Sequence, residues 1–343
     1  MAVVTVEKAL QLWDEALQTQ VHKTETIAVK AAKGYVLAED IMASTDVPAF
    51  PKSAMDGYAI AYEEGRNEYI VDGIIGAGVV WEQAVEPGHA VRIMTGAPVP
   101  DTCDTVIMQE QVVGSGEPGT TITMPGKYKC GDHIIPQGEE CRAGTIVIPR
   151  GTEVTSTVQT ILTGLGRTEI TVNAMPRVLV LTSGHEVIEP GESLTPGKIY
   201  NSNRAMICGL LEDLGFHKIT HYHVSDAPEE LESEINHVLK LSEEADIIIS
   251  SGGVSVGLFD TMPLIYEKLG AQSIYARIQM RPGAASYGAV TPKGQIIFGL
   301  SGNPGAAFNG WHLIVAPTLK RYKGLLNWTT PVVACVMDSE IFK

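Results

Sequence analysis

The sequence predicts a multidomain chain of the α/β class. Its 343 residues suggest two or three domains, at about 150 residues per domain. Residues 45–148 carry short runs of Val, Ile and Thr separated by many glycines and prolines, a pattern typical of β structure. Residues from 176 onward alternate short apolar runs with helical patterns, which is typical of a parallel sheet. We therefore expect a β-rich region followed by an open, largely parallel sheet with helices on both faces.

Composition and charge limit both the class of protein and the kinds of molecule that it could bind. Hydrophobic residues make up 44% of the chain and charged residues 19%, so we expect it to fold throughout. The net charge of −15 opposes binding to nucleic acid or to an anionic membrane. No apolar stretch is long enough to span a membrane, and Glu7 and Lys8 interrupt any signal peptide. Five cysteines without metal-ligand spacing indicate reduced thiols. We expect a soluble, cytoplasmic protein.

An N-terminal helix is predicted after Thr5, a candidate N-cap, because apolar residues recur there at steps of three and four. Its apolar positions are Val6, Leu10, Trp13, Leu17 and Val21. The buried strands predicted in the second half are 178–181, Ile219–Val224, 246–250 and 295–300. Helices are predicted at 206–214 before Gly215, from Pro228 through Leu239, up to Gly270, and over 304–322. An apolar segment at 330–336 predicts one more strand.

Two glycine-bearing loops follow predicted strands of the sheet. Residues 250–257 read Ser-Ser-Gly-Gly-Val-Ser-Val-Gly, and glycines there let backbone amides approach phosphate oxygens. A tight turn is an equally good interpretation, and Leu258 stands where a Walker lysine would be. Residues 300–305 read Leu-Ser-Gly-Asn-Pro-Gly, where helix capping alone explains Asn303 and Pro304. Both loops open on one edge of the sheet, which favours phosphate binding.

Acidic residues recur at the predicted strand ends, at Glu186, Asp226 and Asp260. Carboxylates beside a phosphate repel it unless a divalent cation lies between them, and Mg²⁺ binds carboxylate and phosphate oxygens together. A phosphate site here would therefore imply a metal. Helix capping is the alternative for Asp226 and Asp260.

Other polar residues have weaker signals. Arg277 and Arg281 could bind phosphate or another oxyanion, or simply lie in solvent. His221 and His223 alternate on one strand face, but without a third ligand in the sequence a structural role is favoured over metal binding. Asp56, before Gly57, is explained by a turn.

Seven motifs in order resemble the molybdopterin molybdenumtransferase family, of the MoeA and gephyrin E-domain type. They are PAFPKSAMDGYA (48–59), RIMTGAPVPDTCDTVIMQE (92–110), GDHIIPQGEECRAG (131–144), LTSGHEV (181–187), IYNSNR (199–204), SSGGVSVGLFD (250–260) and LSGNPGA (300–306). The resemblance implies a doubly wound molybdopterin-binding α/β domain, β-rich N-terminal domains, and an elongated homodimer whose partner subunit completes the cleft. It also implies Mg²⁺-dependent insertion of molybdate into adenylylated molybdopterin, with release of AMP.

The resemblance also implies the site residues, which we transfer by motif position. The catalytic residues would be Asp56, Thr95, Glu140, Glu186, Asp226 and Asp260. Asp226, Asp260 and Glu186 would bind the metal. The pterin and phosphates would lie against Ser251, Gly252, Gly253, Ser255, Arg277, Arg281, Ser301, Gly302 and Asn303. The implied partners are small-molecule substrates, a second copy of the chain and other proteins of molybdenum cofactor biosynthesis.

The implied domains are a linking domain (1–44 with 144–175), an inserted β-rich domain (45–143), the α/β domain (176–325) and the start of a shortened C-terminal β domain (326–343). The sequence departs from the family pattern at Glu140 and His185, where aspartates are usual, and at Ala284, where lysine is usual. The alternative function is therefore a molybdopterin-binding or scaffold protein that has lost transfer activity. A third interpretation of the function is the sibling adenylyltransferase, but the motifs at 48–59 and 92–110 disfavour it.

Overall fold

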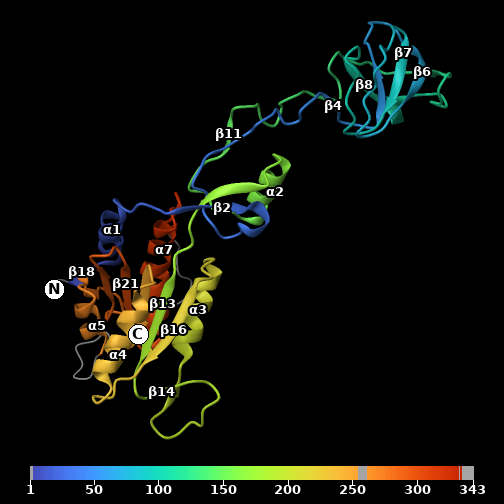
Figure 1. Ribbon diagram of the computed structural model, residues 1–343. Coiled ribbons are helices and arrows are strands. Elements are labelled where there is room, and N and C mark those ends of the chain that lie inside the picture. The colour runs from blue at the N-terminus through green and yellow to red at the C-terminus, as the bar shows by residue number, and fades with distance from the viewer. Residues whose placement is uncertain (1–2, 254–260, 332, 334–343) are drawn as a thin grey trace. The chain divides into compact units, whose positions relative to one another are not determined.

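The computed structural model describes residues 3–253, 261–331 and 333. The chain divides into two compact units (Figure 1). One unit combines Met1–Glu39 with Pro149–Lys343, and the other is Asp40–Ile148. The α/β multidomain fold class is confirmed, whereas the four-domain division remains a prediction. Among the described residues, no helix has the length and apolar character to cross a membrane.

The first unit is built on a six-stranded sheet with the order β16-β13-β17-β21-β20-β18. Four neighbouring strands are parallel: β16 (Ile219–Val224), β13 (Val178–Ser183), β17 (Ile247–Ser251) and β21 (Ile296–Leu300). The edge strands β20 (Tyr287–Val290) and β18 (Gln272–Tyr275) extend it through antiparallel pairs. Val178 pairs with both Ile219 and Ile247, so the parallel strands end together at one edge. This confirms the largely parallel sheet.

Helices cover both faces of the sheet, as predicted (Figure 1). One face packs against α1 (Val6–Leu17), α3 (Ser202–Asp213), α6 (Pro304–Gly310) and α7 (Ala316–Tyr322), with a π-helical turn at Trp311–Val315 between the last two. There Trp13 lies against Phe298, with ring centroids 4.7 Å apart. The other face packs against α4 (Leu231–Ser242) and α5 (Met262–Lys268). Apolar burial on both faces explains the near-continuous apolar character of these strands.

Local signals set several helix ends. Thr5 Oγ1 accepts a hydrogen bond from the Lys8 amide, which confirms the predicted N-cap. The extension of that helix to Val21 is wrong, because α1 ends at Leu17 and Val21 is 89% exposed. The placement of Pro228 in the first turn of α4 is also wrong, because that helix begins at Leu231. Most of the strand predicted at 330–336 falls outside the described residues.

The remainder of the first unit adds a small antiparallel pair, β2 (Thr24–Ala28) with β12 (Glu169–Asn173), and the helix α2 (Ser156–Gly164). The short strand β1 (Val3–Val4) pairs in parallel with β19 (Arg277–Ile278). Lys323, only 4% exposed, connects this region to the α/β core. Its Nζ donates to Gly34 O at 2.7 Å and to Leu214 O at 2.6 Å, so the buried ammonium group is hydrogen-bonded on two sides.

The second unit is a β domain, as its sequence predicted. Its five-stranded sheet has the order β8-β5-β7-β6-β9. The strands are β5 (Gly57–Ile60), β6 (Glu68–Ile75), β7 (His89–Ile93), β8 (Thr105–Met108) and β9 (Thr121–Thr123). Two short pairs join β3 (Ile41–Met42) to β11 (Ile146–Ile148) and β4 (Lys52–Ser53) to β10 (Ile134–Ile135). Burial alternates strictly along β6, as in a sheet with one covered face.

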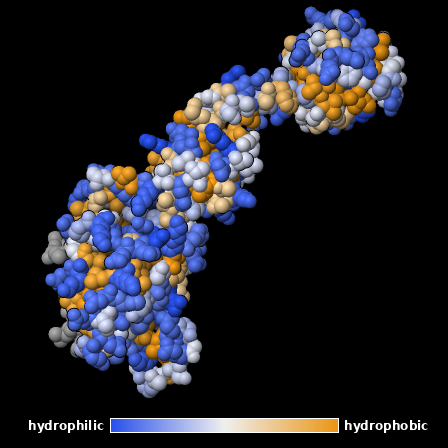
Figure 2. Space-filling view, in the orientation of Figure 1, coloured by the Kyte–Doolittle hydropathy of each residue, from blue (hydrophilic) through white to orange (hydrophobic). Residues whose placement is uncertain are grey.

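The visible surface of the larger unit is mainly hydrophilic (Figure 2). Figure 2 shows hydrophilic residues over most of its visible surface, with smaller hydrophobic areas among them. The unit therefore keeps its apolar residues mainly in the two layers between sheet and helices.

Candidate functional site

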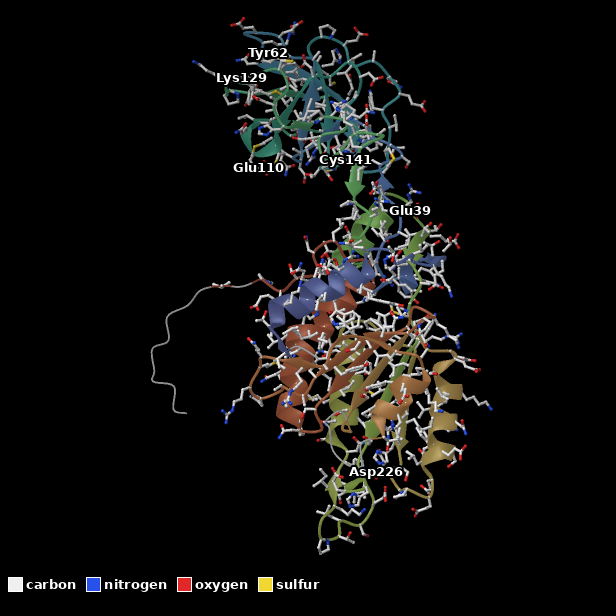
Figure 3. All side chains as sticks on the ribbon, turned by 90° about the vertical axis from the view of Figure 1, so that its left-hand side faces the viewer. Glu39, Tyr62, Glu110, Lys129, Cys141 and Asp226 are labelled. Atoms are coloured by element: carbon white, nitrogen blue, oxygen red, sulfur yellow. The ribbon has the colours of Figure 1, made fainter. Side chains whose placement is uncertain are left out.

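A cavity of about 260 Å³ lies where β13, β17 and β21 end. Its walls come from the loops after these strands, from the start of α3 and from the segment after β16. The lining residues are Thr182, Ser183, Gly184, Glu186, Val187, Ile199, Asn201, Asn203, Asp226, Ser251, Gly252, Gly253, Ala285, Ser301 and Gly302. Figure 3 shows Asp226 at the end of the unit that carries the loop following β13. This is the edge at which open α/β sheets bind ligands.

Close backbone packing explains the glycines of the first loop. Gly252 has φ +88° and Gly253 has φ +61°, in the left-handed region that glycine adopts without strain. A Cβ atom on Gly252 would lie 2.6 Å from Ser183 O. A Cβ atom on Gly302, in the second loop, would lie 3.4 Å from Gly252 Cα. The two loops therefore contact each other directly, and both line the cavity as predicted.

Asn203 holds the two loops together. Its Nδ2 donates to Ser251 Oγ at 2.7 Å and to Gly302 O at 2.8 Å, and Ser251 Oγ donates to Ser301 O at 3.1 Å. Because Gly302 O can only accept, these bonds fix which way the Asn203 amide points. Asn201 caps α3, since its Oδ1 accepts the Arg204 amide at 3.1 Å. The cavity thus combines loop amides with the N-terminus of a 12-residue helix, an arrangement that favours anions.

Two predicted carboxylates line the same cavity, Glu186 and Asp226. Asp226 Oδ2 accepts the His185 amide at 3.1 Å. The capping alternative for Asp226 is wrong, because α4 starts at Leu231 after Glu230. Asp260 and Ser255 lie outside the described residues. In residues 3–253 and 261–331, no group of three or more His, Cys, Asp or Glu side chains is placed to hold a metal ion. The predicted three-carboxylate set therefore remains a prediction.

The other predicted phosphate contacts divide into two groups. Asn303 follows the cavity wall and caps α6, with its Oδ1 accepting the Ala306 amide at 3.2 Å, as predicted. Its own amide donates to Ser301 Oγ at 3.2 Å. Arg277 belongs to β19, which pairs with β1. Arg277 and Arg281 are not among the described residues that line the cavity.

Three further predicted catalytic residues belong to the unit Asp40–Ile148. Asp56 Oδ1 accepts two hydrogen bonds from Thr95, from the backbone N at 2.7 Å and from Oγ1 at 2.8 Å. These bonds, the backbone one first, lower the pKa of the Asp56 carboxyl below its ordinary value. Glu140 lies 3.8 Å from Lys52 Nζ. The Asp56–Thr95 pair shows that Asp56 does more than form a turn.

Sequence reasoning missed several residues of the cavity. Thr182, Asn201, Asn203, Val187 and Ile199 line it but were not predicted as site residues. Asn201 had a detectable signal, an N-cap position before a helical pattern, and both asparagines lie within the IYNSNR motif. The role of Asn203 depends on contacts with residues 48 and 99 positions away, which no local pattern reveals.

Comparisons with known proteins agree with this fold. Residues 4–166 match the family described as the MoeA N-terminal region (domain I and II), and residues 179–321 match a probable molybdopterin binding domain. A molybdopterin molybdenumtransferase of Staphylococcus epidermidis is 40% identical over 309 residues, covering 88% of this chain and 72% of that protein. One from Staphylococcus aureus (strain MRSA252) is 36% identical over 341 residues, covering 96% and 80%.

The fold is similar to that of a molybdopterin biosynthesis MoeA protein from Pyrococcus horikoshii OT3. That structure has a TM-score of 0.77 at 27% sequence identity, with 95% of this chain and 81% of that chain covered. Sequence similarity over most of the chain and structural similarity over both units thus point to one family. The chain belongs to the molybdopterin molybdenumtransferase family, whose members are enzymes of molybdenum cofactor biosynthesis.

Proposed function

We propose that the chain inserts molybdate into adenylylated molybdopterin in a Mg²⁺-dependent reaction that releases AMP. The observation that supports this most is the cavity itself, in which two glycine loops, a helix N-terminus and two carboxylates meet. Adenylylated molybdopterin carries a pyrophosphate link, and water added across that link frees AMP. The cavity supplies backbone amides that can bind the phosphates of this link and carboxylates that can hold a cation beside them.

The anion-binding groups come from the loops. Ser251, Gly252 and Gly253 with Ser301, Gly302 and Asn303 are the proposed contacts to pterin and phosphate. A hydrogen bond to a charged group contributes about 1.5–3 kcal/mol. Two backbone amides and the α3 dipole can therefore hold a phosphate without an adjacent lysine.

The carboxylates oppose that binding unless a cation is present. Two like charges about 4 Å apart repel by ~4 kcal/mol at an effective dielectric constant of ~20, which exceeds one such hydrogen bond. Oxygen donors from Glu186 and Asp226 fit Mg²⁺, which prefers one or two carboxylates together with phosphate oxygens. We propose these two residues, with Asp260, as metal ligands. When bound, the ion would neutralise phosphate charge and polarise the phosphoryl group.

The remaining roles follow from the family resemblance and stay predictions. They include catalytic parts for Asp56, Thr95 and Glu140, phosphate or oxyanion contacts from Arg277 and Arg281, and pterin contact by Ser255. A homodimer, contacts with other proteins of cofactor biosynthesis and a cytoplasmic location belong to the same set.

The test measures AMP by chromatography after mixing the purified chain with adenylylated molybdopterin, Mg²⁺ and molybdate. We expect AMP release that requires all three additions. No release above background would refute the proposal. Tight binding of the pterin without release would support a binding or scaffold protein instead, and ATP-dependent adenylylation of free molybdopterin would support the sibling adenylyltransferase.

A matched pair of variants tests the site. Asp226→Asn removes one charge from the cavity, and Asp213→Asn removes one from an exposed position at the far end of α3. Only the first is expected to reduce AMP release. Equal effects would place the chemistry elsewhere.

A further inference from the structure

Two histidines of β16 adjoin the cavity through the hydroxyl group of Thr182. We propose that His221 and His223 are positioning residues, which fix the Thr182 hydroxyl and, through it, Asn201 at the cavity wall. Their effect on substrate binding rests on the proposed function, whereas the hydrogen-bond arrangement itself does not.

The strand register brings these groups together. Thr182 of β13 pairs with His223 of β16 on one side and with Ser251 of β17 on the other. His221 lies two residues before His223, so both rings project from the same face as Thr182. Thr182 Oγ1 lies 3.1 Å from His221 Nε2 and 3.1 Å from His223 Nδ1. With Thr182 only 2% exposed, these contacts lie largely out of water.

Asn201 is the third partner of the same hydroxyl. Its Oδ1 accepts the Arg204 amide, and its Nδ2 donates to Glu189 Oε1 at 2.8 Å, so the amide orientation is fixed. The second Nδ2 hydrogen is donated to Thr182 Oγ1 at 3.0 Å. Asn201 is 3% exposed and caps α3, so its position sets where that helix begins beside the cavity.

The number of hydrogens available at the Thr182 hydroxyl limits which ring can donate and which can accept. A threonine hydroxyl has one hydrogen and two lone pairs. Asn201 occupies one lone pair, which leaves one hydrogen and one lone pair for two ring nitrogens. One ring must therefore accept from Thr182 and the other must donate to it. Two rings that both present N–H groups, as two imidazolium ions would, do not fit this geometry.

The surrounding charges keep His221 neutral, which allows its Nε2 to be the acceptor. Burial first, and then the Arg204 cation of α3 and the neighbouring His223, lower the pKa of His221 to about 4. Glu189, in the segment after β13, opposes this shift. Burial by itself would raise the pKa of Glu189, but hydrogen bonds from Asn201 and Arg204 outweigh burial and lower it. His221 is thus neutral at neutral pH. We assign its Nε2 as the acceptor, and the hydrogen count then leaves His223 Nδ1 to donate.

The first experiment is ¹⁵N NMR of the histidine rings in the whole chain between pH 6 and 8. We expect an unprotonated Nε2 on His221 and a protonated Nδ1 on His223. Thr182→Val should remove this complementary pattern. The same protonation state at both ring nitrogens that face Thr182 in the unmodified chain would overturn the proposal.

The second experiment compares His221→Leu with His221→Gln, in which the Gln carbonyl replaces the acceptor. We expect His221→Leu to speed hydrogen exchange of the Arg204 amide by about tenfold or more, and His221→Gln to stay within about threefold of the unmodified chain. His217→Leu, at an exposed position in the same unit, is the control and should change nothing. Unchanged exchange in His221→Leu would overturn the positioning role.

Binding of adenylylated molybdopterin, measured by calorimetry, completes the test. We expect His221→Leu to weaken it by about tenfold, and His221→Gln to restore it. Full affinity in His221→Leu would overturn the effect on binding. If the unmodified chain does not bind this compound, the proposed function fails, while the NMR and exchange results still decide the role of the histidines.

Discussion

Gly252→Ala tests whether the close approach of the first glycine loop to Ser183, at the end of β13, needs a glycine. The new Cβ would lie 2.6 Å from Ser183 O, at a residue with φ +88°. Gly197→Ala is the matched control, because Gly197 has φ +86° in the same unit and no atom within 4 Å of the added Cβ. The control therefore carries the backbone strain without the steric contact.

The two effects can be given magnitudes. An alanine in the left-handed region costs roughly 1–2 kcal/mol. Forcing an extra methyl group into a packed site costs typically about 1–3 kcal/mol more. We expect Gly197→Ala to lower the free energy of unfolding by about 1–2 kcal/mol and Gly252→Ala to lower it by about 2–5 kcal/mol. Gly252→Ala should also weaken binding of adenylylated molybdopterin by at least about tenfold, because the first glycine loop, a proposed phosphate contact, must move away from Ser183.

Urea unfolding followed by tryptophan fluorescence measures the difference. Trp13 and Trp311 lie in the core of the unit that contains Gly252, so their signal reports on it. Equal destabilisation by the two substitutions would show that the contact with Ser183 contributes nothing. Unchanged ligand binding in Gly252→Ala would separate this loop from the site.

Three further outcomes are expected. Asp226→Asn should reduce AMP release by at least about tenfold while changing the free energy of unfolding by less than about 0.5 kcal/mol, as measured by urea unfolding; a larger loss of stability would make the residue structural. Lys323→Met should lower that free energy by about 2–4 kcal/mol, because the carbonyls of Gly34 and Leu214 lose a buried donor; a thermal melt close to that of the unmodified chain would contradict this. Stability should fall as the pH drops from 6.5 to about 4, because His221 binds a proton in the unfolded chain and not in the folded one; His221→Gln should flatten this dependence, and a parallel curve would assign the loss to other groups.

The sheet was predictable because buried parallel strands have a simple pattern. The strand Ile219–Val224 was predicted with the observed bounds. The strand predicted at 178–181 is two residues longer in the structure, where it ends at Ser183. Capping signals are also local, as Thr5 and Asn303 show. Helix ends without such a signal were predicted less well. Pro228 fits a first helical turn by its φ angle, yet the chain turns once more before α4 begins at Leu231.

The site was predictable only in part, because its contacts join distant residues. The sequence places Asp226 after a strand, but its bond to the His185 amide spans 41 positions. Thr182 lies just beyond the strand predicted at 178–181, and only the register shows that it lies between His223 and Ser251. Side-chain hydrogen bonds across neighbouring strands leave no periodic pattern in the sequence. The three-dimensional arrangement was needed to find them.

The larger unit is built from two stretches of sequence that Asp40–Ile148 separates, and this has a consequence for synthesis on the ribosome. Strand β2 ends at Ala28, but its partner β12 is complete only at Asn173, and α1 waits still longer for α7. At a translation rate of about 5–20 residues per second, β12 is complete roughly 7–30 s after β2. During that interval Asp40–Ile148 is fully translated and can fold on its own contacts. The apolar face of α1 stays uncovered during that interval, so the nascent N-terminal segment is exposed to aggregation until its partners are made.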